Sequence, residues 1–195
     1  NPKSLNDEII LSLLIDKKGD AWLGTESNGI NYLNSKGKQL GHVNRHSYLA
    51  SPLLNDDVRD FSLDKQNRLW VSTARGIYLF FNEGFIKAES LYPGLSVLQK
   101  AFITKVLFDN DDIWISTLGL GIIRFNIATN KLTQFWPRNK NALSTQYNSV
   151  VKYGQKVIFS SRGYGLAVYD ETSNSLQPYL AQFKNMPAHT IDLLV

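Results

Sequence analysis

One phrase recurs four times along this chain at a nearly constant spacing. Each copy holds a polar turn, a short apolar run and, a few residues later, a glycine followed by an aliphatic residue. The large residues within the apolar runs are Trp22, Trp70, Trp114 and Ile158, so successive copies lie 48, 44 and 44 residues apart. A fixed period in this range is typical of a modular array, and it constrains the fold more than any single residue does.

A second column of apolar residues has the same period. Pairs of apolar residues three positions apart precede each polar turn: Ile10 and Leu13, Val58 and Phe61, Ile103 and Val106, and Tyr147 and Val150. A fifth copy begins with Ile191 and Leu194. Two independent columns that share one period argue against a chance repeat.

Each repeat divides into four short segments that are rich in β-formers and separated by turns containing Asp, Asn and Gly. Four antiparallel strands in about 45 residues is the size of a propeller blade. We therefore predict an all-β chain of about four β-propeller blades plus the first strand of a fifth, forming a single propeller region over residues 1–195. The predicted repeats cover residues 7–54, 55–99, 100–143, 144–187 and, in part, 188–195.

The ends of the chain interrupt this pattern, and we expect the chain to be a fragment of a larger propeller. Four blades and one strand would leave sheet faces open if the whole ring has more blades. We therefore expect a four-bladed closure, an association of fragments, or a ring that is incomplete in this chain.

The large residue at the centre of each apolar run is predicted to lie in the core. It is followed two positions later by a small residue, at Gly24, Ser72, Ser116 and Ser160. A large side chain beside a small one on the same strand face suits interdigitated packing between sheets. We expect these positions to be buried and to make no ligand contact.

Composition excludes several classes of function. The chain has 43% hydrophobic residues and a net charge of +4, with Lys and Arg scattered singly, so we expect no nucleic-acid partner. It has no cysteine, which removes disulfides and thiolate metal sites and fits a cytosolic or a Gram-negative periplasmic protein equally well. No apolar run approaches the roughly 18 residues of a membrane span, and no signal segment opens the chain.

The residues that could carry chemistry do not converge on a catalytic or metal site. His42 and His46 lie between a predicted fourth strand and the next blade, where a solvated loop explains them better than a metal site. The stretch 109–112 lacks the glycine and closing glutamate of a calcium loop and reads as a hairpin turn. We predict no enzyme activity, metal or cofactor for this region.

A ligand would bind where the turns interrupt the repeat. One face of a propeller is built from the turns between second and third strands together with the connections between blades. The side chains that break the repeat in these turns are Glu26, Asn28, Arg75, Arg162 and Tyr164. A carboxylate, two guanidinium groups and a phenol around one mouth could hold a polar ligand such as a sugar acid; the alternative is that they are solvated turn residues. A second candidate is residues 91–95, as a docking patch or as packing against a neighbouring blade.

The second repeat resembles the two-component regulator propeller repeat. Asn55-Asp-Asp-Val58-Arg-Asp-Phe61-Ser-Leu-Asp64 and then Leu69-Trp70-Val-Ser-Thr73-Ala-Arg-Gly76-Ile77 follow the family pattern closely. The first repeat follows it as well, and the third fits with a turn one residue shorter. The fourth departs from it, because Tyr153 replaces the aspartate and Ile158 the tryptophan.

This resemblance implies an extracytoplasmic, periplasmic sensor region of a bacterial inner-membrane receptor. The cytoplasmic part of such receptors is commonly a histidine kinase, often a hybrid, or a diguanylate cyclase, and in some relatives the propeller recognises a sugar fragment. The implied partners are a small polar or carbohydrate ligand, the rest of the parent receptor and a second copy. Contact with the membrane would be only through other parts of the parent. The alternative is a protein-interaction scaffold without a small ligand; an enzyme would need a carboxylate pair on the ligand face, and the sequence offers none.

Overall fold

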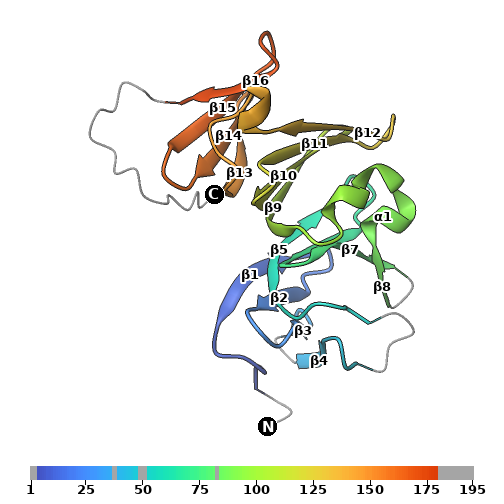
Figure 1. The fold of residues 1–195 in the computed structure, drawn as a ribbon. Helices are drawn as coiled ribbons and strands as arrows, with labels where there is room; N and C mark the ends of the chain where they lie inside the picture. Colours follow the sequence, from blue (N-terminus) through green and yellow to red (C-terminus); the bar gives the residue numbers. More distant parts are fainter. Residues whose placement is uncertain (1–3, 37–38, 48–51, 82–83, 180–195) are drawn as a thin grey trace. The chain divides into compact units, whose positions relative to one another are not determined.

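The computed structural model describes residues 4–36, 39–47, 52–81 and 84–179. These residues form four antiparallel sheets, each with four strands in sequence order (Figure 1). The predicted all-β fold is therefore confirmed. The chain divides into two compact units, Asn1–Lys100 and Ala101–Val195, and each unit holds two of the sheets. The single propeller region over 1–195 remains a prediction, and the partial repeat 188–195 with Ile191 and Leu194 lies outside the described residues.

Each sheet corresponds to one predicted repeat and is called a blade below. Blade 1 holds β1 (Ile10–Ile15), β2 (Ala21–Thr25), β3 (Ile30–Leu33) and β4 (Gln39–Val43), and blade 2 holds β5 (Val58–Leu63), β6 (Leu69–Thr73), β7 (Gly76–Phe81) and β8 (Gly84–Lys87). Blade 3 holds β9 (Phe102–Asp109), β10 (Asp112–Leu118), β11 (Ile122–Asn126) and β12 (Lys131–Phe135), and blade 4 holds β13 (Tyr147–Tyr153), β14 (Lys156–Ser161), β15 (Gly165–Asp170) and β16 (Ser175–Pro178).

Short helical segments occur in two connections between blades. Helix α1 (Ala88–Leu91) and the 3-10 helix η1 (Pro93–Leu98) follow blade 2, and the 3-10 helix η2 (Pro137–Asn139) follows blade 3. No helix in the described part of the chain is long and apolar enough to cross a membrane.

A β-bulge in every first strand explains why the apolar residues there are three positions apart. The pairing of the first strand with the second shifts register once in each blade, between Ile10 and Ser12, Val58 and Asp60, Ile103 and Lys105, and Tyr147 and Ser149. In a regular strand, residues on one face are two apart. A bulge inserts one extra residue, so residues three apart can face the same side.

The hairpin turns between first and second strands have the backbone that their composition predicts. A residue with positive φ lies in each turn: Gly19, Asn67, Asn110 and Gly154, with φ of 82°, 64°, 58° and 58°. Glycine and asparagine adopt this left-handed conformation most readily.

The core of each unit lies between its two sheets. In unit 1, Trp22 and Ile30 of blade 1 pack in one cluster with Val58, Phe61 and other residues of blade 2. In unit 2, Trp114 and Ile122 of blade 3 pack in one cluster with Tyr147, Val150 and other residues of blade 4.

The central column is buried as predicted, including Ile158 in the divergent copy. Replacing such a buried tryptophan by alanine typically costs about 3–5 kcal/mol.

The patch predicted at residues 91–95 packs largely against its own unit. The ring of Tyr92 stacks on Trp70 with centroids 5.7 Å apart, and its hydroxyl accepts a 2.8 Å hydrogen bond from Arg68 Nη2. Leu95 is buried, whereas Leu91 is exposed. Packing against a blade therefore explains most of this segment.

Candidate functional site

The turns between second and third strands meet the connection between blades at one end of each unit. In unit 1, the amide of Gly29 donates to the carbonyl of Asp56 at 2.9 Å, and the amide of Ala74 donates to that of Asp57 at 3.0 Å. We call the surface formed by residues 26–28, 44–47, 55–57 and 74–75 the turn face of unit 1.

Unit 2 repeats this arrangement. The amide of Gly121 donates to the carbonyl of Thr145 at 3.0 Å, and the amide of Arg162 donates to that of Gln146 at 3.0 Å. We call the surface formed by residues 118–120, 144–146 and 162–164 the turn face of unit 2. The backbone therefore joins turns and connections within each unit, which is the arrangement on which the ligand-site prediction depends.

The predicted site residues lie on both turn faces. Glu26, Asn28 and Arg75 are on the turn face of unit 1, and Arg162 and Tyr164 are on that of unit 2. Glu26, Arg75, Arg162 and Tyr164 are exposed. Ligand contact by these five side chains remains a prediction.

The side chain of Asn28 takes part in a hydrogen-bond network with Asp7 and Ser27. Its side-chain amide donates to Oδ2 of Asp7 at 3.1 Å, and the same oxygen accepts bonds from the amide of Ser27 at 3.0 Å and from its hydroxyl at 2.9 Å. Asp7 thus fixes the turn that carries Asn28 and Glu26. Hydrogen bonds to the carboxylate, above all from the amide of Ile9 and then from Ser27 and Asn28, lower the pKa of Asp7 well below its ordinary value, against an opposing effect of burial.

A buried asparagine next to this turn was not predicted from the sequence. Asn31 on β3 is fully buried. Its Oδ1 accepts a 3.2 Å hydrogen bond from the backbone amide of Asn6, and its Nδ2 donates a 2.6 Å hydrogen bond to Oδ1 of Asn6. Nδ1 of His42 lies 2.8 Å from Oδ1 of Asn31. The expectation that His42 lies in a loop is wrong, because it belongs to β4. One feature of the sequence could have pointed to the role of Asn6. The pair Asn6-Asp7 precedes the first strand of blade 1 much as Asn55-Asp-Asp57 precedes the first strand of blade 2.

The acidic connection of unit 1 is held by arginines. Asp56 accepts a 2.8 Å hydrogen bond from the amide of Arg45 and forms a 3.0 Å ion pair with its Nε. Asp57 pairs with Arg59 at 2.5 Å. These carboxylates therefore stabilise the path of the chain between blades.

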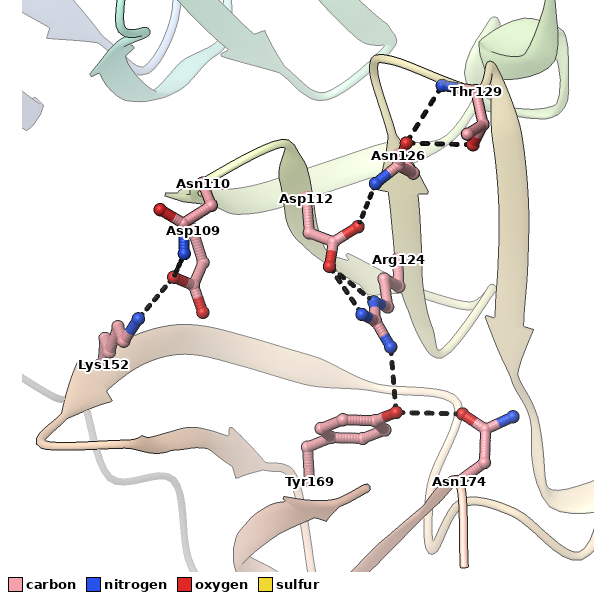
Figure 2. A network of polar contacts seen from close by, with 9 residues as sticks. All are labelled: Asp109, Asn110, Asp112, Arg124, Asn126, Thr129, Lys152, Tyr169 and Asn174. Carbon is pink, nitrogen blue, oxygen red and sulfur yellow. Dashed lines mark hydrogen bonds and ion pairs between the residues drawn. The ribbon is translucent and has the colours of Figure 1, made fainter. Parts of the chain in front are cut away.

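At the opposite end of unit 2, a polar network joins blades 3 and 4 (Figure 2). The carboxylate of Asp112 accepts bonds from Arg124 Nε at 3.0 Å and Nη2 at 2.6 Å, and from Asn126 Nδ2 at 2.9 Å. Asp109 is paired with Lys152 of blade 4. The stretch 109–112 thus forms a hairpin turn whose two end carboxylates face cations, and within the described ranges no group of three or more His, Cys, Asp or Glu could hold a metal ion.

Arg124 is the centre of this network. Its Nη1 donates to the hydroxyl of Tyr169 in blade 4 at 2.9 Å, and its guanidinium carbon lies 5.3 Å from the ring centroid of Trp114 and 5.4 Å from that of Tyr169. Figure 2 shows the guanidinium between Asp112 and the Tyr169 hydroxyl. Arginine can stack on an aromatic ring while it donates several hydrogen bonds, and here its hydrogen bond and ring contact with Tyr169 tie blade 3 to blade 4.

Comparison with known proteins gives one family match. The family model described as "Two component regulator propeller" matches residues 4–27 and 52–75. These segments hold the first two strands of blades 1 and 2 with their hairpin turns. The match therefore falls on the two repeats whose sequence resembles the family most closely.

A curated relative and two solved structures extend the comparison. Histidine kinase P4 of Formosa agariphila is 24% identical over 92% of this chain, which spans 13% of that protein. The extracellular domain of a B. thetaiotaomicron protein classed as a hybrid two-component system has a TM-score of 0.73 and 18% identity over 98% of this chain and 25% of its own. Virginiamycin B lyase from Staphylococcus aureus has a TM-score of 0.67 and 14% identity over 96% of this chain and 60% of its own.

The two structural likenesses establish the fold, and the low shares of the other chains fit a part of a larger propeller. The sheets, the repeat columns and the family match agree with one another. The chain is accordingly a set of β-propeller blades, and its first two blades match the two-component regulator propeller model.

Proposed function

We propose that this chain is the extracytoplasmic, periplasmic sensor part of a bacterial membrane receptor of the two-component type, and that it recognises a small polar or carbohydrate ligand without acting on it. The observation that carries the proposal is the family match at residues 4–27 and 52–75. The alignment with a histidine kinase over 92% of the chain supports it. The rest of the receptor and a second copy are the proposed partners.

The turn faces are the proposed ligand-binding surfaces. Arg75 and Arg162 are exposed there, and guanidinium groups bind carboxylates through two parallel hydrogen bonds. Tyr164 offers an aromatic face with a polar tip. An acidic sugar suits these surfaces better than a neutral apolar ligand, because each turn face exposes a guanidinium group: Arg75 in unit 1, together with the carboxylate of Glu26, and Arg162 in unit 2, together with the phenol of Tyr164.

A thermal-shift screen of neutral and acidic oligosaccharides tests this proposal. A ligand at 100 times its Kd stabilises the folded state by about 2.7 kcal/mol, which raises the Tm by several degrees in a chain of this size. Arg75→Ala or Arg162→Ala should reduce that shift, whereas Lys131→Ala, an exposed cation at the start of β12, should not.

Two other outcomes would contradict the proposal. If no sugar shifts the Tm but a purified protein domain binds the chain, the alternative of an interaction scaffold is favoured. If a glycan is cleaved, the region is an enzyme, as the likeness in fold to a lyase permits. Against catalysis stands the observation that the carboxylates of Asp7, Asp56 and Asp57 are all held by hydrogen bonds or ion pairs with neighbouring residues.

A further inference from the structure

Asn28 and Gly29 form an Asn-Gly pair, and no other asparagine in the chain is followed by glycine. An Asn-Gly pair deamidates more readily than other asparagine pairs, because glycine has no side chain to shield its amide nitrogen from the preceding side chain. The pair lies on the turn face of unit 1, between β2 and β3. It is therefore the place where spontaneous covalent modification of this chain is chemically easiest.

The fold requires the glycine of this pair. Gly29 has a φ of 78°, and a Cβ added to it would lie 2.2 Å from the carbonyl oxygen of Val43. In the other copies the residue before the matching glycine is not asparagine but Arg75, Leu120 or Tyr164. The first copy alone thus combines the required glycine with a preceding asparagine.

Deamidation begins when the amide nitrogen of Gly29 attacks the side-chain carbonyl carbon of Asn28. A succinimide ring closes, and the side-chain nitrogen leaves as ammonia. Water then opens the ring at either carbonyl, which leaves aspartate or isoaspartate at position 28. Water is consumed and ammonia is released, so the reaction needs no oxidant, reductant or further co-reactant.

In the folded chain both reacting groups are held by hydrogen bonds. The amide of Gly29 donates to the carbonyl of Asp56 at 2.9 Å. The side-chain amide of Asn28 donates to Oδ2 of Asp7 at 3.1 Å. Both bonds oppose the reaction, because the attacking nitrogen has to lose its proton and the side chain has to be free to reach the geometry of the ring.

The backbone around Asn28 is fixed as well. Its amide donates to the hydroxyl of Thr25 at 3.0 Å, and its carbonyl accepts a 2.9 Å bond from the side-chain amide of Asn6. Oδ2 of Asp7 also accepts bonds from the amide and the hydroxyl of Ser27. Asp7 is thus the acceptor that holds both Asn28 and the residue before it.

We propose that Asn28 is a latent deamidation site on the turn face of unit 1, and that Asp7 keeps it unreactive in the folded chain. Local opening of the segment before β1 removes the bonds to Asp7 and exposes the pair to reaction. This inference goes beyond the proposed sensor function, since it concerns a covalent change of the turn whichever ligand the turn face binds.

The products would not restore the contact with Asp7. An aspartate at position 28 has no N–H to donate and brings a second negative charge beside the Asp7 carboxylate. An isoaspartate carries the chain through its side-chain carbon and so lengthens the backbone of the turn. Modification therefore fixes the turn that carries Glu26 in its open state, and the change is irreversible without repair.

Peptide mapping by mass spectrometry tests the proposal. The chain and its Asp7→Ala variant are incubated at mildly alkaline pH, and the tryptic fragment 19–36 is followed for conversion of asparagine to aspartate or isoaspartate. Asp7→Ala should convert Asn28 about tenfold faster, because hydrogen bonds to a charged acceptor are strong and local opening limits the reaction. Asp170→Ala is the matched control, since Asp170 accepts the amide and hydroxyl of Ser173 in the same way in unit 2; it should leave the rate at Asn28 unchanged.

Two further measurements keep the test decisive if Asp7→Ala weakens the whole fold. Asp7→Asn keeps the shape of the side chain and should give a smaller increase in rate. The chain unfolded in urea gives the unprotected rate, which should exceed that of the folded chain. A folded chain that converts as fast as the unfolded one would overturn the proposal. So would a wild-type rate in either Asp7 variant that circular dichroism shows to be folded, or conversion of Asn34 before Asn28.

Discussion

The indole nitrogen of Trp70 donates a hydrogen bond to Oδ2 of Asp64 at 3.0 Å, six residues earlier in the chain. The same oxygen binds Nε of Arg68 at 2.5 Å, and the carboxylate is almost fully buried. Trp22 and Asp16 make the equivalent bond at 3.3 Å. In the first two copies the aspartate and the tryptophan of the repeat are thus two ends of one contact, and the fourth copy, which has Tyr153 and Ile158, lacks both residues.

Asp64→Ala should cost about 3 kcal/mol or more in the free energy of unfolding, because it leaves the indole and the Arg68 guanidinium without their buried acceptor. Asp109→Ala is the matched control. Asp109 occupies the same column but forms a more exposed pair with Lys152, for which about 1 kcal/mol or less is expected. Urea unfolding at neutral pH measures the free energy of unfolding of both variants. Equal losses of stability would contradict the expectation that the buried contacts of Asp64 stabilise the fold more than the pair of Asp109 does.

Trp70→Phe should cost about 1 kcal/mol more than Trp114→Phe. The third copy has one residue fewer between its aspartate and tryptophan, and Trp114 Nε1 is buried with no hydrogen-bond partner among the described residues. Removing that N–H therefore loses packing alone, whereas removing the Trp70 N–H also takes a donor from Asp64. The denaturant midpoints of the two variants measure this difference in stability. A larger loss of stability for Trp114→Phe than for Trp70→Phe would refute the expectation.

Gly121→Ala should be far more destabilising than Gly165→Ala, although both glycines belong to the same repeat column and have positive φ, 76° and 69°. The left-handed conformation costs a non-glycine residue about 1 kcal/mol or slightly more. At Gly121 an added Cβ would also lie 2.1 Å from the carbonyl oxygen of Phe135, whereas at Gly165 nothing lies within 4 Å. Thermal unfolding of both variants is the measurement, and similar Tm values would show that the backbone at 121 relaxes freely.

Asp7→Asn should lower stability at neutral pH and have little effect in acid. Because hydrogen bonds from Ile9, Ser27 and Asn28 lower the folded-state pKa of Asp7, its contribution is present above the unfolded pKa of about 3.9. That contribution is lost as pH falls through the folded-state value. The difference between the unfolding midpoints of the two proteins, measured from pH 7 down to pH 2, should shrink steadily once the pH falls below about 4. Parallel curves over this range would mean that the carboxylate charge is not the stabilising feature.

Much of the fold followed from the sequence, because strand alternation and turn chemistry are local. The Trp22, Trp70 and Trp114 column predicted buried strands, which is confirmed. The turns expected from Asp, Asn and Gly form as well, with glycine or asparagine at positive φ. The three-residue spacing of Ile10 and Leu13 needed the structure for its explanation, since a bulge is seen only in the pairing of two strands.

The candidate ligand site could be predicted from the sequence less completely than the fold. The sequence places Asn28 and Arg75 in equivalent turns, but it does not reveal that Asn28 is bound to Asp7, 21 residues away, while Arg75 is exposed. Which polar side chains are engaged depends on where distant segments return to the sheet.

The repeat by itself therefore determined that the chain forms four-stranded blades and which residues lie between them, because a period of two along a strand and a period near 45 along the chain are properties of the sequence. Only the tertiary structure decided that Asn31 is buried beside Asn6, and that Trp114 lacks the acceptor that Trp70 has. The physical reason is that burial and hydrogen bonding are set by neighbours in space, and identical positions in a repeat need not have identical neighbours.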